Sequence, residues 1–333
     1  MRMKKTNRLY RCLLPLVWLT FLLSSCIKED YAGSTDETAT VNLVFSTRAD
    51  GQGTADVDEN EGIKTLRVLI TDADGKVEIN TVQNFNDVSQ TTLTILGVPV
   101  GTKNFYVIAN EASVGLTDLD DVSTVDGNFL NRVITNPSDA PYFPKTRSQI
   151  STSGLPITGM KEGVQVKGGE NQRIEIEIVH TVAKVVLYVD NQSGEPFTLQ
   201  QVKFGPFIAD RTYLFDKSQQ LPVGVQFNEM PLDAENVEVT PDKDEAVFTG
   251  YIYETGLRDI SDFTLSLVSN TKGFEALATP VTIHFDEAGR NYINRNDQVE
   301  IRAIVNIHKE VETDLDILVV PWGEKDIDVP PFS

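Results

Sequence analysis

The chain has 333 residues, 40% of them hydrophobic, with 29 basic and 49 acidic side chains and a formal net charge of −20. This length is sufficient for two domains with separate hydrophobic cores. The acidic balance argues against a nucleic-acid-binding protein, because lysine and arginine contacts to phosphates supply most of that affinity. It favours instead a solvated surface whose like charges repel one another.

The first 25 residues have the pattern of an export signal. Five basic residues precede an apolar run of eleven, LLPLVWLTFLL at 13–23. A transmembrane helix requires about 20 apolar residues, so the run is typical of a cleaved signal peptide rather than of a membrane span. Loss of residues 1–25 would leave 24 basic and 49 acidic residues, a net charge of −25.

Cysteine usage points to a lipid anchor. Cys12 lies in the leader, so Cys26 would be the only thiol of the exported chain and no intrachain disulfide could form. The sequence Leu23-Ser24-Ser25-Cys26 resembles a bacterial lipobox, whose cysteine is acylated (with palmitate, for example) and becomes the first residue. An unmodified exported thiol is the alternative. Each buried methylene contributes about 0.8 kcal/mol, so a multiply acylated Cys26 would hold the protein firmly in a membrane.

Residues 26–39 predict the acylated cysteine and a short tether, because they are polar and contain few hydrophobic side chains. Within them, Lys28-Glu29-Asp30 resembles the signal that directs some lipoproteins to the outer face of the outer membrane. A simple solvated tether would have the same composition. We therefore expect an outer-membrane lipoprotein precursor.

Residues 40–62, TVNLVFSTRADGQGTADVDENEG, combine a strand pattern with an accessible acidic segment. Val41, Leu43 and Phe45 fall on one face of an extended chain, which predicts a strand packed on one side. Arg48 follows this strand and is the only basic residue of the stretch. The five acids and the glycines after it cannot form a core, so we expect them to be accessible.

The remainder of the first half shows short strand patterns separated by turn residues. A long β-rich run at 171–191 changes its inward face near residue 180, which is typical of a strand that serves two domains. We therefore place an N-terminal domain at 40–180 and a C-terminal domain at 181–333. The other strands expected in the first half lie at 63–70, 91–97, 104–110 and 155–160.

Helical patterns are scarce. One short helix is predicted around Leu116, Leu119 and Val122, within a less regular region. Many short strands with frequent Gly, Pro, Asn and Asp turns indicate an all-β protein of two β-sandwich domains.

The chain also ends on a strand pattern, in which Leu315, Ile317 and Val319 alternate with other positions. Strands next to terminal segments are those whose edges are most exposed. The strands expected in the second half lie at 246–254, 262–270, 279–285, 297–307 and 314–320.

The sequence nominates no catalytic residue, metal ligand or cofactor site. His180, His284 and His308 lie far apart, within or beside strand patterns, as satisfied histidines commonly do. There is no HExxH, CxxC, GxSxG or phosphate-binding glycine motif. The sequence DADG at 72–75 lacks the downstream glutamate of a calcium loop and is better explained as a hairpin turn. We therefore expect a protein that is not an enzyme.

Carbohydrate binding is the main functional alternative for an exposed surface lipoprotein. Tyr142 and Phe143, between two prolines, could form a small aromatic platform for sugar stacking. Against this, Trp322 would be the only tryptophan of the exported chain, and loop aromatics usually pack back onto their own domain.

Taken together, these features resemble one family, the fimbrillins that build type V pili of Gram-negative anaerobes. The resemblance covers essentially the whole chain and rests on the order and spacing of individually loose motifs. One departure is His180-Thr181-Val182, where the family often has an arginine before its Ala-Lys strand. The matching features are the lipobox, Thr47-Arg48, VGTKNFYVIAN at 100–110, LPITGM at 155–160, Ala183-Lys184, YIYE at 251–254, NYINRNDQVEIRAIV at 291–305 and Pro321-Trp322.

The resemblance implies tandem transthyretin-like β-sandwiches that assemble by strand exchange. An arginine-specific protease would cut between Arg48 and Ala49, and the first strand would leave its groove. A neighbour's C-terminal strand would then fill that groove. The displaced strand would carry Val41, Leu43 and Phe45, and the candidate donor strand would carry Leu315, Ile317 and Val319.

The resemblance also implies partners and a location. The partners would be further copies of the chain, accessory fimbrial subunits and the protease, and the product would be a fimbrium at the cell surface. Stalk, tip and anchor subunits share the fold, and the combination of Arg48 with an apolar C-terminal strand favours a stalk role. Tip and anchor roles, like the glycan-binding lipoprotein, stay open as alternatives.

Overall fold

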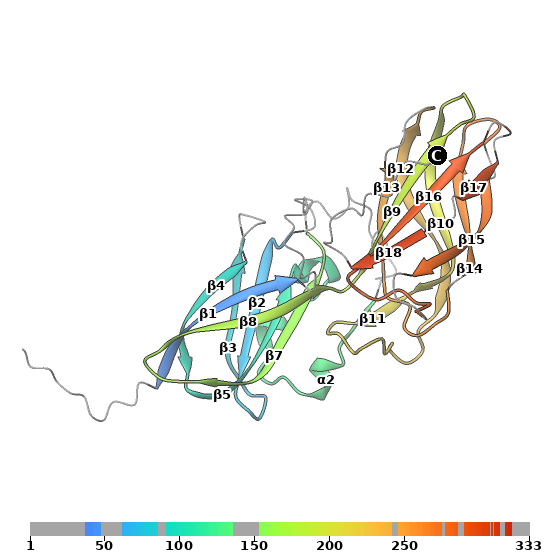
Figure 1. Cartoon of the computed structure of the whole chain (residues 1–333). Coiled ribbons are helices and arrows are strands. Elements are labelled where there is room, and N and C mark those ends of the chain that lie inside the picture. Colours follow the sequence, from blue (N-terminus) through green and yellow to red (C-terminus); the bar gives the residue numbers. More distant parts are fainter. Residues whose placement is uncertain are drawn as a thin grey trace, which may run out of the picture.

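The computed structural model (Figure 1) consists mostly of β-strands, in one sheet within residues 38–180 and another within residues 183–321. The prediction of a mostly β protein with little helix is confirmed. No helix in the described part of the chain is long and apolar enough to span a membrane. The structure describes residues 37–47, 62–85, 91–135, 153–241, 246–260, 262–274, 277–285, 290–306, 308, 310–313 and 317–321.

The first sheet has seven strands, in the spatial order β3-β2-β5-β7-β8-β1-β4. Their bounds are β1 (Thr38–Thr47), β2 (Thr65–Thr71), β3 (Val77–Asn84), β4 (Thr92–Pro99), β5 (Gly101–Ala109), β7 (Ile157–Val166) and β8 (Asn171–His180). β1 runs parallel to β8, whereas the other neighbouring strands are antiparallel.

One face of this sheet closes on a single hydrophobic core, to which alternate residues of β1, β2, β5 and β8 contribute. On β5, Phe105, Val107 and Ala109 lie in this core. The opposite face is buried as well, because Tyr106 and Ile108 pack into a cluster shared with the C-terminal half. The strand predicted at 104–110 is therefore present, and it is buried on both faces from Phe105 to Ala109.

Between β5 and β7 the chain forms short helical turns, namely η1 (Glu111–Val114), η2 (Leu119–Asp121) and α2 (Gly127–Leu130). The short helix predicted around Leu116, Leu119 and Val122 is present only as the 3-10 turn η2. Gly115, with a left-handed φ of 68°, ends the first turn before a helix can propagate. α2 begins only after Asp126, whose side chain caps it by accepting a backbone hydrogen bond.

The second sheet has nine strands, in the order β12-β10-β14-β15-β18-β16-β9-β13, and β17 also pairs with β16. Their bounds are β9 (Ala183–Asn191), β10 (Phe197–Ala209), β12 (Phe227–Val239), β13 (Ala246–Ile252), β14 (Asp262–Ser269), β15 (Leu277–Phe285), β16 (Asp297–Val305), β17 (Val311–Thr313) and β18 (Ile317–Pro321). Its core is a separate cluster of buried side chains.

The run at 171–191, predicted as one strand that serves two domains, forms two strands in different sheets. β8 ends at His180 and β9 begins at Ala183. Asn296, in a left-handed conformation with φ 62°, fixes the connection. Its backbone N–H donates to Val182 O at 2.8 Å, and its side-chain oxygen accepts from the His180 backbone N–H at 3.2 Å.

A third hydrophobic cluster joins the two halves of the chain. Tyr106 and Phe129 from the first half meet Phe215 and Tyr251 from the second. Beside this cluster, β6 (Val133–Thr135) and β11 (Arg211–Tyr213) pair as a two-stranded sheet with one strand from each half. The halves therefore share both apolar burial and backbone hydrogen bonds.

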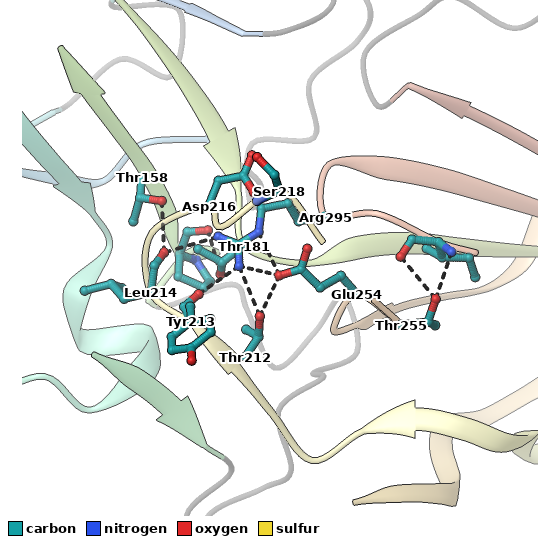
Figure 2. Close-up of polar contacts among 12 residues, drawn as sticks. Thr158, Thr181, Thr212, Tyr213, Leu214, Asp216, Ser218, Glu254, Thr255 and Arg295 are labelled. Atoms are coloured by element: carbon teal, nitrogen blue, oxygen red, sulfur yellow. Dashed lines mark hydrogen bonds and ion pairs between the residues drawn. The ribbon is translucent and has the colours of Figure 1, made fainter. Parts of the chain in front are cut away.

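A buried ion pair strengthens this junction (Figure 2). Arg295 pairs with Glu254, and both side chains are almost completely buried. The Thr212 hydroxyl donates to Glu254 at 2.7 Å, and the guanidinium donates to the Tyr213 carbonyl at 2.8 Å. These partners satisfy charges that would otherwise be costly to bury.

Candidate assembly site

β1 lies in the interior of its sheet, between β8 on one side and β4 on the other. Val41 and Leu43 are fully buried, and Phe45 is 4% exposed. All three belong to the core of the first sheet. Full burial contributes about 1.5–3 kcal/mol for each such side chain, so the three together contribute about 5–9 kcal/mol. That is comparable with the whole stability of an ordinary domain.

The β1 backbone is paired along both edges. Its register with β8 runs from Thr40 opposite Asn171 to Thr47 opposite Ile178. On the β4 side, the Phe45 N–H donates to Thr91 O at 2.8 Å. Loss of β1 would leave unpaired ladder groups on both neighbours, an outcome that proteins avoid. The space that β1 occupies is here called the β1 groove.

One wall of the β1 groove depends on β1 itself. Among the strands described, β4 pairs with β1 alone and forms an edge of the sheet. A bulge at Gly97, which has a φ of 71°, interrupts its register. Without β1, β4 would be held mainly by the core packing of Ile95 and Val98.

The outer face of the β1 groove is polar. The Asn42 amide donates to Asn171 Oδ1 of β8 at 2.5 Å, and Asn42 Oδ1 accepts from the Thr94 hydroxyl of β4 at 2.7 Å. Asn42 thus links both neighbours of β1. Arg173 lies opposite Asn42 in the register and forms an exposed ion pair with Glu175 at 3.0 Å.

Comparison with known proteins gives this arrangement a context. Residues 39–174, which begin in β1 and end in β8, match the family model described as major fimbrial subunit protein (FimA). Over this segment the chain is similar to the FimA family. The match covers most of β1 and the first four residues of β8, its parallel partner.

Solved structures extend the likeness of fold to most of the chain. A fimbrilin from Porphyromonas gingivalis W83 has a TM-score of 0.54 at 14% identity, covering 86% of this chain and 98% of its own. The C-terminally truncated tip fimbrial protein Mfa3 from Porphyromonas gingivalis has a TM-score of 0.53 at 14% identity, covering 86% and 99%. A fimbrial assembly protein from Parabacteroides distasonis ATCC 8503 has a TM-score of 0.51 at 18% identity, covering 83% and 98%.

At these identities the solved structures show a shared fold. No curated protein sequence matches the chain. The FimA family consists of structural subunits of fimbriae, which agrees with the prediction that the chain is not an enzyme. The predicted resemblance to fimbrillins is confirmed.

The residues predicted for assembly are not brought together in this structure. Val41, Leu43 and Phe45 fill the β1 groove, whereas the candidate donor strand lies in the other sheet. There β18 is parallel to β15 and antiparallel to β16. Val319 is fully buried in the second core, and Ile317 opens the strand. The predicted residues outside the described ranges are Cys26, Arg48, Ala49 and Leu315.

Other candidate sites gain no support. His180 is buried, with its ring Nδ1 3.1 Å from Asn296 Oδ1, His284 lies in β15 and His308 is exposed. Within the described ranges, no group of three or more His, Cys, Asp or Glu side chains could hold a metal ion. The aromatic pair proposed as a sugar platform, residues 142–143, falls outside those ranges.

Sequence reasoning missed the polar face of the groove. Nothing in the sequence context of Asn42 links it to Thr94 or Asn171. Those contacts depend on a pairing between strands more than 50 residues apart.

Proposed function

We propose that the chain is a stalk subunit of a type V pilus that assembles by protease-triggered β-strand exchange. Cleavage between Arg48 and Ala49 would release β1, and a strand from a neighbouring subunit would take its place. The observation that carries the proposal is the position of β1. It is an interior strand with three buried apolar side chains, and it ends at Thr47, one residue before Arg48.

The uncut precursor would be a lipoprotein held in the outer membrane through acylated Cys26. Support for this step comes from the apolar run and lipobox of the sequence. Cleavage after Arg48 would separate the lipid, tether and β1 from the rest of the chain. The remaining link would carry 22 basic and 45 acidic residues, and its like charges would discourage lateral clumping of fibres.

The proposed link consists of two tandem transthyretin-like β-sandwich domains, 40–180 and 181–333. Two observations support this division. Each sheet has its own hydrophobic core, and the chain changes sheet between His180 and Ala183. The shared third cluster would keep the two domains together when a fibre is pulled.

The donor would be the C-terminal strand of a neighbouring copy, carrying Leu315, Ile317 and Val319. Its alternation of apolar residues matches the inward face of β1. To act as donor, β18 must first leave the slot between β15 and β16, which uncovers the core contact of Val319. Insertion into a neighbour would restore equivalent burial.

Cleavage alone would not free β1, because its ladder and its buried side chains still hold it. The cut would instead convert a tethered strand into a separate peptide. Rebinding of a tethered strand is favoured by an effective concentration in the millimolar range, and that advantage ends when the peptide can diffuse away. A competing donor strand could then enter the groove.

The test uses the exported chain with Cys26 replaced by serine and treated with an arginine-specific protease. We expect a new N-terminus at Ala49, loss of the β1 peptide and fibres visible by electron microscopy. The matched control is Arg48→Lys, which keeps the positive charge but removes the specific cleavage site, and it should stay monomeric. Normal fibres from Arg48→Lys would refute the proposal.

A truncation after Lys309 separates a stalk role from the alternatives. A stalk subunit without its donor strand should still be cut but should not extend fibres. A tip subunit, which needs only to accept a strand, would be incorporated once and would lose nothing on truncation. Unimpaired extension by the truncated chain would exclude the proposed donor strand.

A further inference from the structure

We propose that the polar outer face of the β1 groove sets the register of the incoming strand by recognising Asp316 of a second copy of this chain. This inference rests on the proposed strand exchange. The recognising residues are Thr94 of β4 with Asn171 and Arg173 of β8. Together they surround the position that Asn42 occupies before exchange.

The Asn42 position differs from the others on the outer face of β1. Its amide bonds to strands on both sides, through Thr94 at 2.7 Å and Asn171 at 2.5 Å. Thr94 is its direct cross-strand partner in β4, and Arg173 is its partner in β8. Any strand that replaces β1 must therefore place a side chain among these three polar groups.

The chemistry of the three groups suits a carboxylate. The Thr94 hydroxyl and the Arg173 guanidinium can both donate hydrogen bonds, and the Asn171 amide can rotate to present its NH2 group. Arg173 adds a positive charge, which pairs with the exposed carboxylate of Glu175 before exchange. A charge-assisted bond to an aspartate is stronger than the neutral amide contact that it would replace.

The C-terminal segment VETDLDILVVP at 311–321 can supply such a carboxylate if it replaces β1 in the same direction. One register places its residues as follows. Asp316 takes the Asn42 position, and Leu318 takes the half-buried Val44 position. Pro321 falls at Thr47, the last residue of β1, where a missing ladder donor matters least. The inward positions 39, 41, 43 and 45 then receive Thr313, Leu315, Ile317 and Val319.

A shift of the incoming strand by two residues toward the C-terminal end of the β1 groove is disfavoured. It would place Asp316 at the Val44 position, directly opposite Glu175. Like charges directly opposite each other destabilise a pair of strands.

A shift of the incoming strand by two residues toward the N-terminal end of the β1 groove is disfavoured for different reasons. It would put Leu318 between the polar groups of the Asn42 position. It would also put Pro321 at the Phe45 position, whose backbone N–H donates to Thr91 O at 2.8 Å. Proline has no N–H and cannot replace that bond. The register with Asp316 at the Asn42 position thus avoids the repulsion by Glu175, keeps Leu318 away from the polar groups and keeps Pro321 away from the Phe45 position.

Disulfide trapping in assembled fibres tests the register directly. Both native cysteines precede Arg48, so the cut chain contains none. The test variant combines Thr94→Cys with Asp316→Cys, and its controls combine Thr94→Cys with Asp314→Cys or with Leu318→Cys. Directly opposed residues have Cβ atoms about 4.5–5.5 Å apart, close to disulfide geometry, whereas diagonal neighbours are about 7–8 Å apart.

We expect the Asp316→Cys pair to link successive subunits into ladders that a reductant dissolves, with little linkage in the two control pairs. Fibres that link mainly through Asp314→Cys or Leu318→Cys, or through none of the pairs, would overturn the register but leave strand exchange standing. Failure of the unmodified cut chain to form fibres would overturn the proposed function and this inference with it.

A charge reversal tests the role of Arg173 separately. Arg173 is largely exposed, so Arg173→Glu should leave the uncut fold intact, as a melting curve can verify. Arg173→Glu or Asp316→Lys alone should slow fibre growth about threefold to fivefold, the size expected of one cross-strand pair. The double variant should recover most of the wild-type rate. Equal slowing in the single and double variants would refute the pairing of Asp316 with Arg173.

Discussion

Replacement of Leu43 by alanine measures how strongly β1 is held. The Leu43 side chain is 0% exposed and lies in the first core with Ile174. The substitution removes three carbons, worth about 2.4 kcal/mol at about 0.8 kcal/mol per methylene. The cavity left behind should bring the loss to about 2–5 kcal/mol.

Two assays report this loss. Urea unfolding of the uncut chain should give a free energy of unfolding lower by about 2–5 kcal/mol. After cleavage, release of the β1 peptide should be faster, because the same contacts hold the separate strand. A loss of 3 kcal/mol corresponds to roughly 100-fold, since about 1.4 kcal/mol is a factor of ten.

The matched control is Val44→Ala, on the outer face of the same strand. Val44 is half-buried, so this substitution should cost less than about 1 kcal/mol and change peptide release little. Equal effects of Leu43→Ala and Val44→Ala would refute the reasoning that the inward face of β1 holds it in the groove.

Three further predictions follow from the geometry. Hydrogen exchange after removal of β1 should show that the amides of β4 lose protection while those of β2 keep theirs. The reason is that β4 has no second strand partner among the described residues. Unchanged exchange of the β4 amides would contradict this prediction. Arg295→Met should lower the free energy of unfolding by about 3–5 kcal/mol, since it leaves Glu254 buried without its ion pair; in urea unfolding, adding Glu254→Gln should recover most of that loss. Burial raises the pKa of Tyr253 above its usual value, so the folded state holds this proton more tightly than the unfolded state does. Stability that is fully present below about pH 10 should therefore fall as the pH rises further, and Tyr253→Phe should flatten that decline in thermal melts.

The sequence predicted those parts of the fold that depend on local alternation. The inward faces of β1 and β5 and the change of face between β8 and β9 follow from period-2 patterns, and the structure has them. It did not predict β10 or β12. A register shift interrupts the alternation of β10 before Gly205-Pro206. β12 contains Pro231, and its Glu235 and Asn236 both have positive φ.

The candidate site could be predicted only in part for the same reason. Alternation identified Val41, Leu43 and Phe45 as an apolar face, but it could not show which strands flank it. The parallel pairing of β1 with β8 joins residues about 130 positions apart, and no local pattern encodes such a pairing. The polar contacts of Asn42 follow from that pairing, so they became visible only in the folded chain.

In the proposed assembly, the cut rather than the affinity of the donor decides when exchange occurs. Each strand presents three large apolar side chains to the same groove, and full burial of an apolar side chain contributes about 1.5–3 kcal/mol whichever strand supplies it. The contributions of the two strands are therefore of the same order, and the tethered β1 prevails while it is covalently attached. Cleavage after Arg48 removes that advantage and leaves selection to the groove. At that stage Thr94, Asn171 and Arg173 would favour the one register that presents a carboxylate to them. Timing and register would thus be controlled by different residues, and for this reason Arg48→Lys and Asp316→Lys should fail at different steps, the first before β1 is released and the second after.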